Sequence, residues 1–152
     1  MAAHHVVFLD RATVKARVRP PACAEAYVEH PKTSSDEVLQ RLAGATVAIT
    51  NKVPLRADVL SQLPALKMIA VAATGYDVID VPYCREHGIA VANIRNYAVH
   101  TVPEHAFALI LALRRSLLAY RADVEAGVWN KADTFCFFDH PIRDLAGSTL
   151  GV

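Results

Sequence analysis

Three short segments of the sequence carry polar residues or glycine directly after apolar runs, and these are the positions where chemistry is expected. Residues 50–52 (TNK) end one apolar run, residues 73–77 (ATGYD) end a second, and residues 96–98 (NYA) follow a third. In an open parallel sheet, ligands bind beyond the carboxyl ends of the strands. If the runs are parallel strands, the three segments meet at one edge of the sheet and form a binding site there.

The sharpest of these segments contains Ala73, Thr74 and Gly75. Glycine lets the backbone turn closely and present N–H groups to an anion, and the Thr74 hydroxyl adds a further donor. Lys52, after the preceding run, adds a cation. Together these residues predict a site for a small carboxylate. The plainer interpretations, an ordinary turn between a strand and a helix and a solvated surface lysine, remain open.

Other kinds of site find little support in the sequence. No GxSxG, HExxH, Walker A or complete GxGxxG pattern is present. The three cysteines, Cys23, Cys84 and Cys136, are widely spaced and form no CxxC or zinc-ligand pattern. They predict reduced thiols in a cytoplasmic protein, and we expect no metal site.

Composition and charge narrow the range of partners. The chain is 53% hydrophobic and 20% charged, and its formal net charge is +1. Because the basic residues are scattered, no strong field attracts nucleic acid or a membrane surface. The longest strongly apolar run, residues 106–113, is too short to span a bilayer. We therefore expect a globular protein that binds neither nucleic acid nor membrane.

Short apolar runs alternate with helical patterns along the first hundred residues. This alternation predicts βαβ units and a parallel sheet, and runs that are apolar throughout predict helices on both of its faces. The sequence therefore predicts an α/β fold with a flavodoxin-like, doubly wound parallel sheet. The predicted strands are residues 5–9, 26–29, 45–50, 66–73 and 89–94, and the predicted helices are residues 34–43, 56–63 and 80–87.

The pattern from Thr101 to Glu125 predicts one long helix that ends before Gly127. Thr101 and Glu104 have the spacing of a capping box. Residues 106–113 are apolar on every side, and a helix of this kind is covered on every side. Because a small sheet covers only one side, this helix predicts a second domain or subunit, and in this chain self-association. The aromatic segment that follows, residues 129–140, is typical of an arm that packs on another part of the structure.

The order and spacing of several pieces resemble the D-isomer-specific 2-hydroxyacid dehydrogenases. The resemblance covers roughly residues 40–152, and residues 51–53 and 96–98 are most similar to the glycerate dehydrogenase/hydroxypyruvate reductase branch. The pieces are residues 67–80 (KMIAVAATGYDVID), 87–91 (HGIAV), 101–105 (TVPEH), 127–129 (GVW) and 144–151 (DLAGSTLG).

The resemblance implies a substrate-binding domain that is incomplete in this chain and is joined to a coenzyme domain by a long interdomain helix. Residues 1–100 would be the flavodoxin-like substrate domain, residues 101–147 the interdomain and dimer-contact helix with its arm, and residues 148–152 the start of a truncated Rossmann domain. It also implies that backbone N–H groups at Ala73, Thr74 and Gly75 bind the substrate carboxylate. Lys52 remains the added cation. Thr74 and Val102 would lie near the cofactor.

The implied reaction is hydride transfer between NAD or NADP and a small 2-keto or 2-hydroxy acid. The family's catalytic arginine, acidic residue and histidine lie beyond the end of this chain, so no catalytic residue is assigned. We expect the chain alone to be inactive, to bind no cofactor, and to form a homodimer or higher oligomer. The alternative is a non-catalytic, self-associating module or a shortened gene product.

Overall fold

A computed structural model describes residues 4–151 of the chain. The chain divides into two compact units, Met1–Asn96 and Tyr97–Val152. Asn96, at the boundary, has a left-handed backbone with φ of 61°. Val152, which the sequence analysis placed at the start of a coenzyme domain, lies outside the described residues.

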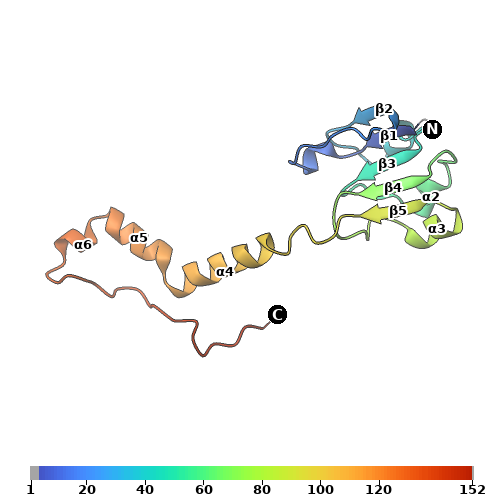
Figure 1. Ribbon diagram of the computed structural model, residues 1–152. Coiled ribbons are helices and arrows are strands. Elements are labelled where there is room, and N and C mark those ends of the chain that lie inside the picture. The colour runs from blue at the N-terminus through green and yellow to red at the C-terminus, as the bar shows by residue number, and fades with distance from the viewer. Residues whose placement is uncertain (1–3, 152) are drawn as a thin grey trace. The chain divides into compact units, whose positions relative to one another are not determined.

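The first unit is built on a five-stranded sheet in which every described pairing is parallel. Figure 1 shows the strands side by side in the order β2-β1-β3-β4-β5. This is the flavodoxin-like order, and the α/β fold with a parallel sheet is confirmed. The strands are β1 (His4–Phe8), β2 (Ala24–Glu29), β3 (Val47–Thr50), β4 (Met68–Val71) and β5 (Ala90–Asn93).

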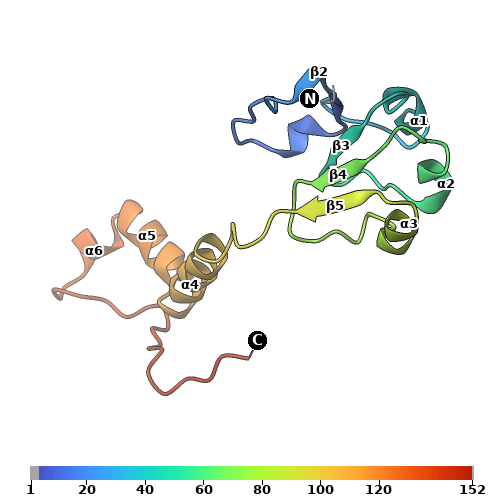
Figure 2. The same cartoon turned by 45° about the vertical axis from the view of Figure 1, so that its right-hand side comes forward.

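Three short helices of the first unit cover one face of this sheet (Figure 2). They are α1 (Val38–Arg41), α2 (Ala57–Leu60) and α3 (Val81–Glu86). The buried core joins one side chain or more from each helix with alternate residues of the strands, which point to the same face. Its members include Val7, Leu9, Val38, Leu42, Ala48, Leu60, Ile69, Val71 and Cys84.

The opposite face of the sheet has no α-helix among the described residues of this unit, which differs from the expected cover on both faces. The β1–β2 connection, whose helix would lie there, holds only the 3-10 turn Arg11–Thr13 and irregular chain. Pro20 and Pro21 in this connection disfavour a helix because proline cannot donate a backbone hydrogen bond. As a result Val47, Ile49 and Met68 on the second face remain partly exposed.

The start of α3 follows the prediction. The Asp80 carboxylate accepts a hydrogen bond from the Tyr83 N–H (3.1 Å), and Pro82 lies in the first turn, where its missing N–H is no loss. At the other end Gly88 has φ of 69°, which glycine adopts without strain. These signals fix where the chain turns back into β5.

The second unit contains α4 (Thr101–Arg114), α5 (Leu117–Glu125) and α6 (Val128–Lys131). The prediction of one continuous helix over residues 101–125 is therefore wrong. Ser116 has φ of 48°, a left-handed backbone that ends α4. The break is stabilised by the returning chain, since the Ser116 hydroxyl donates to the Pro141 carbonyl (2.6 Å) and the Arg143 N–H donates to the Arg114 carbonyl (2.8 Å).

The predicted capping box at the start of α4 is also wrong. His100 is the N-cap and its side chain makes no capping bond, while Thr101 is already helical. The first turn is closed through the backbone alone, because the Glu104 N–H donates to the His100 carbonyl (3.0 Å). Because Thr101 already has a helical backbone, it cannot adopt the extended N-cap geometry that a capping box needs.

The aromatic segment after α6 packs on α5 of its own unit. The Tyr120 hydroxyl donates to the His140 carbonyl (2.8 Å), and the Tyr120 and Phe137 rings lie 5.5 Å apart. His140 also pairs with Asp123 of α5 (2.6 Å between Nε2 and Oδ2). Residues 132–148 therefore run back along α5 and α4 as an ordered arm (Figure 1).

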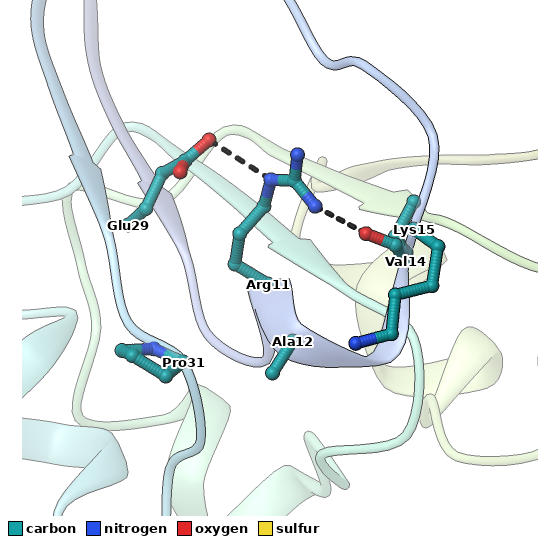
Figure 3. A pocket seen from close by; sticks show the side chains of 6 residues that line it. All are labelled: Arg11, Ala12, Val14, Lys15, Glu29 and Pro31. Atoms are coloured by element: carbon teal, nitrogen blue, oxygen red, sulfur yellow. Dashed lines mark hydrogen bonds and ion pairs between the residues drawn. The ribbon is translucent and has the colours of Figure 1, made fainter.

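At the edge strand β2, Glu29 joins the ends of β1 and β2. Its Oε1 atom lies 3.2 Å from Arg11 Nε, and it also accepts a hydrogen bond from the Tyr27 hydroxyl (2.7 Å). Figure 3 shows the Arg11 guanidinium extended between Glu29 and the Val14 carbonyl. Burial, together with the hydrogen bond to Glu29 and the charge of that carboxylate, raises the pKa of Tyr27 to about 12.

We predict that Tyr27 stabilises the fold in a pH-dependent way. Because its folded pKa of about 12 exceeds the ordinary value of 10.0, its contribution is complete below pH 10 and is lost as the pH rises through 12. An ultraviolet titration of tyrosine ionisation should lose its component near pH 12 in Tyr27→Phe. Tyr97→Phe, an exposed tyrosine of the second unit, is the control. If both variants keep that component, the assignment to Tyr27 is wrong.

Candidate functional site

The predicted site residues of the first unit lie on neighbouring strands at the carboxyl edge of the sheet. Thr50, the last residue of β3, is in register with Val71, the last residue of β4. The pairing continues beyond the strands, since the Ala72 N–H donates to the Thr50 carbonyl (2.8 Å). Lys52 and Thr74 therefore lie just beyond the ends of two adjacent strands, β3 and β4, as the sequence predicted.

The loops that carry these residues are hydrogen-bonded to each other. Leu55, in the loop after β3, forms an isolated bridge with Ile79, in the loop after β4. The Leu55 N–H donates to the Val78 carbonyl (3.0 Å), and the Asp80 N–H donates to the Leu55 carbonyl (3.0 Å). The two loops are thus held side by side without help from any ligand.

The loop after β4 is supported from β5. The Asn93 side-chain amide donates to the Thr74 carbonyl (2.8 Å), and the Ile94 N–H donates to the Ala73 carbonyl (3.1 Å). These two bonds use carbonyl groups of the turn as acceptors and involve none of its N–H groups. Ala73 is buried, whereas Thr74 and Gly75 are exposed.

Three backbone N–H groups of this loop have no acceptor among the described residues. Within residues 4–151, no hydrogen bond is made by the N–H groups of residues 74, 75 and 76, which are consecutive and exposed. In water such groups are solvated, and in a site they bind an anion. The structure therefore has a row of free backbone donors at residues 74–76, which overlaps the predicted residues 73–75 at Thr74 and Gly75.

Gly75 has a different role in this turn from the expected one. Its φ is not in the left-handed region, so the backbone conformation itself does not require glycine. A Cβ at this position would meet only the Asp77 Oδ1 atom, at 3.3 Å. An alanine methyl group at this position would therefore crowd the Asp77 carboxylate and no other group within 4 Å.

Lys52 and Val102, the other two predicted contact residues, lie in different units of the chain. Lys52 is exposed at the same edge as Thr74. Val102 belongs to the second unit, in the first turn of α4, and 62% of its surface is exposed. Its contact with a cofactor therefore stays a prediction.

One residue of this edge was missed by the sequence analysis. Asp10 directly follows the β1 region, is only 3% exposed, and accepts hydrogen bonds from the N–H groups of Asn51 and Lys52. The available signal was an acidic residue immediately after a buried apolar run. That signal is not specific, because nothing local shows which backbone a carboxylate will meet.

A cavity of about 380 Å³ lies near the ends of β1 and β2, and none of the predicted site residues lines it (Figure 3). The Arg11 guanidinium in its wall is already engaged by Glu29 and by the carbonyl groups of Val14 and Ala16. This engagement leaves little capacity to bind a ligand anion. The cavity is lined by Arg11, Ala12, Val14, Lys15, Glu29 and Pro31.

The described residues lack the parts for several other functions. Over residues 4–151, no three histidine, cysteine, aspartate or glutamate side chains are grouped so that they could hold a metal ion. The helices described in that range are all too short or too polar to cross a membrane. What the edge of the sheet offers is recognition of a small anion through backbone N–H groups and an ammonium group.

Comparison with known proteins agrees with this geometry. The family model for the D-isomer specific 2-hydroxyacid dehydrogenase catalytic domain matches residues 6–149. The chain is 53% identical over 148 residues to glycerate dehydrogenase of Methylorubrum extorquens, covering 97% of this chain and 47% of that protein. It is 35% identical over 120 residues to hydroxypyruvate reductase of Blautia hydrogenotrophica, covering 79% of this chain and 37% of the relative.

Among solved structures, D-lactate dehydrogenase from Aquifex aeolicus, complexed with NAD and lactic acid, matches with a TM-score of 0.58 and 26% identity. The match covers 80% of this chain and 37% of that one. The chain thus spans less than half the length of these relatives. A family model that covers nearly all of the chain, together with these similarities, leads to one conclusion: this chain belongs to the D-isomer-specific 2-hydroxyacid dehydrogenases.

Proposed function

We propose that this chain is the substrate-binding portion of an NAD(P)-dependent D-2-hydroxyacid dehydrogenase of the glycerate dehydrogenase, hydroxypyruvate reductase or glyoxylate reductase type. The observation that carries the proposal is the row of unpaired N–H groups at residues 74–76, beside the exposed Lys52, at the carboxyl edge of the sheet. The substrate would be a small 2-keto or 2-hydroxy acid. The relatives named for glycerate and hydroxypyruvate support that class.

The chain's own residues would bind and orient the substrate. Two or three N–H groups and an ammonium group fix a carboxylate in one plane, which places the neighbouring C2 atom in a defined position. NAD or NADP would supply the hydride chemistry. Thr74 and Val102 are the residues that we propose lie near this cofactor.

In this proposal the described residues would meet only the nicotinamide end of such a cofactor. A pyrophosphate is usually bound where a glycine-rich turn opens a helix, and no complete GxGxxG pattern occurs in the sequence. The domain assignment also stays a proposal, with residues 1–100 as the substrate domain, 101–147 as the interdomain helix and arm, and 148–152 as the start of a coenzyme domain. The cytoplasmic location also stays a proposal.

We predict that Lys52→Met weakens binding of hydroxypyruvate to this chain about fivefold, because an exposed charge contact is worth about 1 kcal/mol. The measurement is a chemical-shift titration of the ¹⁵N-labelled chain, in which the amide signals of residues 74–76 should move most.

Gly75→Ala should also weaken binding. It should change the free energy of unfolding by no more than about 1 kcal/mol, since the backbone there suits any residue.

Lys67→Met is the matched control for this titration. Lys67 is exposed like Lys52 but immediately precedes β4, so it lies at the amino edge of the sheet. Its loss should leave the affinity unchanged. Equal effects of Lys52→Met and Lys67→Met would show that general charge, and not the proposed site, attracts the ligand.

We also predict that the 152-residue chain alone does not oxidise NADH in the presence of hydroxypyruvate or glyoxylate. The reason is that the described edge binds a carboxylate but presents no arranged acid, base or cofactor site. The measurement is the loss of NADH absorbance with chain purified from two independent expression hosts. Turnover that scales with the chain's concentration in both preparations would overturn the prediction.

The second candidate function, a non-catalytic self-associating module or a shortened gene product, is favoured by the apolar surface of the second unit. No residue of α4 or α5 is buried, and Leu113 and Leu118 are 78% and 72% exposed. Apolar patches of this extent mark contact surfaces. A second copy of the chain would cover them, and this agrees with the homodimer or higher oligomer expected from the sequence.

We predict that the chain is a dimer or larger at micromolar concentration, measured by light scattering after size-exclusion chromatography. Leu113→Glu should shift it toward the monomer, because burying a carboxylate in an apolar interface is costly. Gln40→Glu adds the same charge at an exposed position of the first unit and should have no effect. A monomeric mass for the unmodified chain would count against self-association.

A further inference from the structure

Asp10 is a buried carboxylate at the point where the strand order reverses, between β1 and β3. Its Oδ1 and Oδ2 atoms lie 2.9 and 3.1 Å from the Asn51 nitrogen, and Oδ2 lies 2.6 Å from the Lys52 nitrogen. Only 3% of its surface is exposed. In doubly wound folds this reversal is where ligands bind, so the location itself connects Asp10 to the site.

Backbone groups alone satisfy the Asp10 side chain. Among the ion pairs of residues 4–151, none involves Asp10. A buried carboxylate is costly unless hydrogen bonds replace its hydration, and here N–H groups of one loop do so. The Asp10 carboxylate therefore stabilises the conformation of the loop after β3.

The rest of that loop is fixed from two more sides. The Val53 N–H donates to the Thr50 hydroxyl oxygen (3.0 Å), and that hydroxyl donates to the Val53 carbonyl (3.1 Å). The Asn51 side-chain amide donates to the Thr13 hydroxyl oxygen (3.0 Å). The N–H groups of residues 51–53 are thus all bonded within the protein, so these three residues can offer an anion only side-chain donors, and Lys52 is the one charged residue among them.

We propose that Asp10 is a positioning residue for Lys52, holding its backbone so that the ammonium group serves the carboxylate site at residues 74–76. The proposal rests on the proposed function, and it adds a residue that touches no ligand. In the loop after β3 the N–H groups of Asn51 and Lys52 donate to Asp10, whereas in the loop after β4 the N–H groups of residues 74–76 have no acceptor among the described residues. A flexible lysine side chain on a fixed backbone loses less entropy on binding than one on a mobile loop.

The test is a double-mutant cycle on the full 152-residue chain with Asp10→Asn, Lys52→Met and both together. Asparagine keeps one acceptor oxygen but turns an NH₂ group toward the remaining N–H. The dissociation constant for hydroxypyruvate is measured by ¹⁵N chemical-shift titration. We expect Asp10→Asn to raise it three- to fivefold and the double variant to bind no more weakly than Lys52→Met alone.

Asp80→Asn is the control, since it makes the same chemical change at the start of α3 and asparagine still caps a helix. Its effect on affinity should be small and should add to that of Lys52→Met. If the effects of Asp10→Asn and Lys52→Met are additive as well, Asp10 acts on the fold in general and the proposal is overturned.

A second measurement needs no variant and covers the case in which Asp10→Asn fails to fold. Native-state hydrogen exchange should find the N–H groups of Asn51 and Lys52 protected at least tenfold more than those of residues 74 and 75. Equal exchange rates for these two pairs of N–H groups would show that Asp10 does not fix the loop after β3, and the proposal would be overturned. If the unmodified chain binds no hydroxypyruvate while that protection is observed, the carboxylate site fails, and Asp10 retains only a structural role.

Discussion

The parallel pairing of β3 with β4 is the constraint on which the rest of the first unit depends. Because both strands run in the same direction and end in register at Thr50 and Val71, their following loops emerge at one edge. The bridge between Leu55 and Ile79 then keeps these loops together. The ligand site proposed at this edge would therefore not have to be assembled by the ligand, since the sheet fixes where both loops begin.

The two loops use their backbone donors in opposite ways. After β3 the N–H groups of Asn51, Lys52 and Val53 are consumed by Asp10 and Thr50. After β4 the bonds from Asn93 and Ile94 occupy carbonyl groups and leave the N–H groups of residues 74–76 open. One loop is therefore a rigid support for a charged side chain, and the other is a row of donors for an anion.

The second unit shows how tertiary contacts override a helical pattern. Residues 101–125 have the pattern of one long helix, yet the helix breaks at Ser116, where the returning arm supplies partners for the exposed ends. Arg143 binds the Arg114 carbonyl, and Arg115 pairs with Asp144. The cost of one left-handed serine, of order 1–3 kcal/mol, is offset by such contacts, and no local signal announces them.

The sequence by itself determined the strands, their parallel arrangement and the edge at which the site lies, since alternation of apolar runs with short helices permits few other topologies. It also determined Thr74, Gly75 and Lys52 as candidates, because each directly follows a strand. Tertiary structure decided the rest. Asp10 meets the N–H groups of Asn51 and Lys52 across some forty positions of chain. The break at Ser116 depends on residues 141–144, and the uncovered face of the sheet depends on a connection that forms no α-helix. Local propensity reports on near neighbours, whereas these features come from partners that only folding brings into contact.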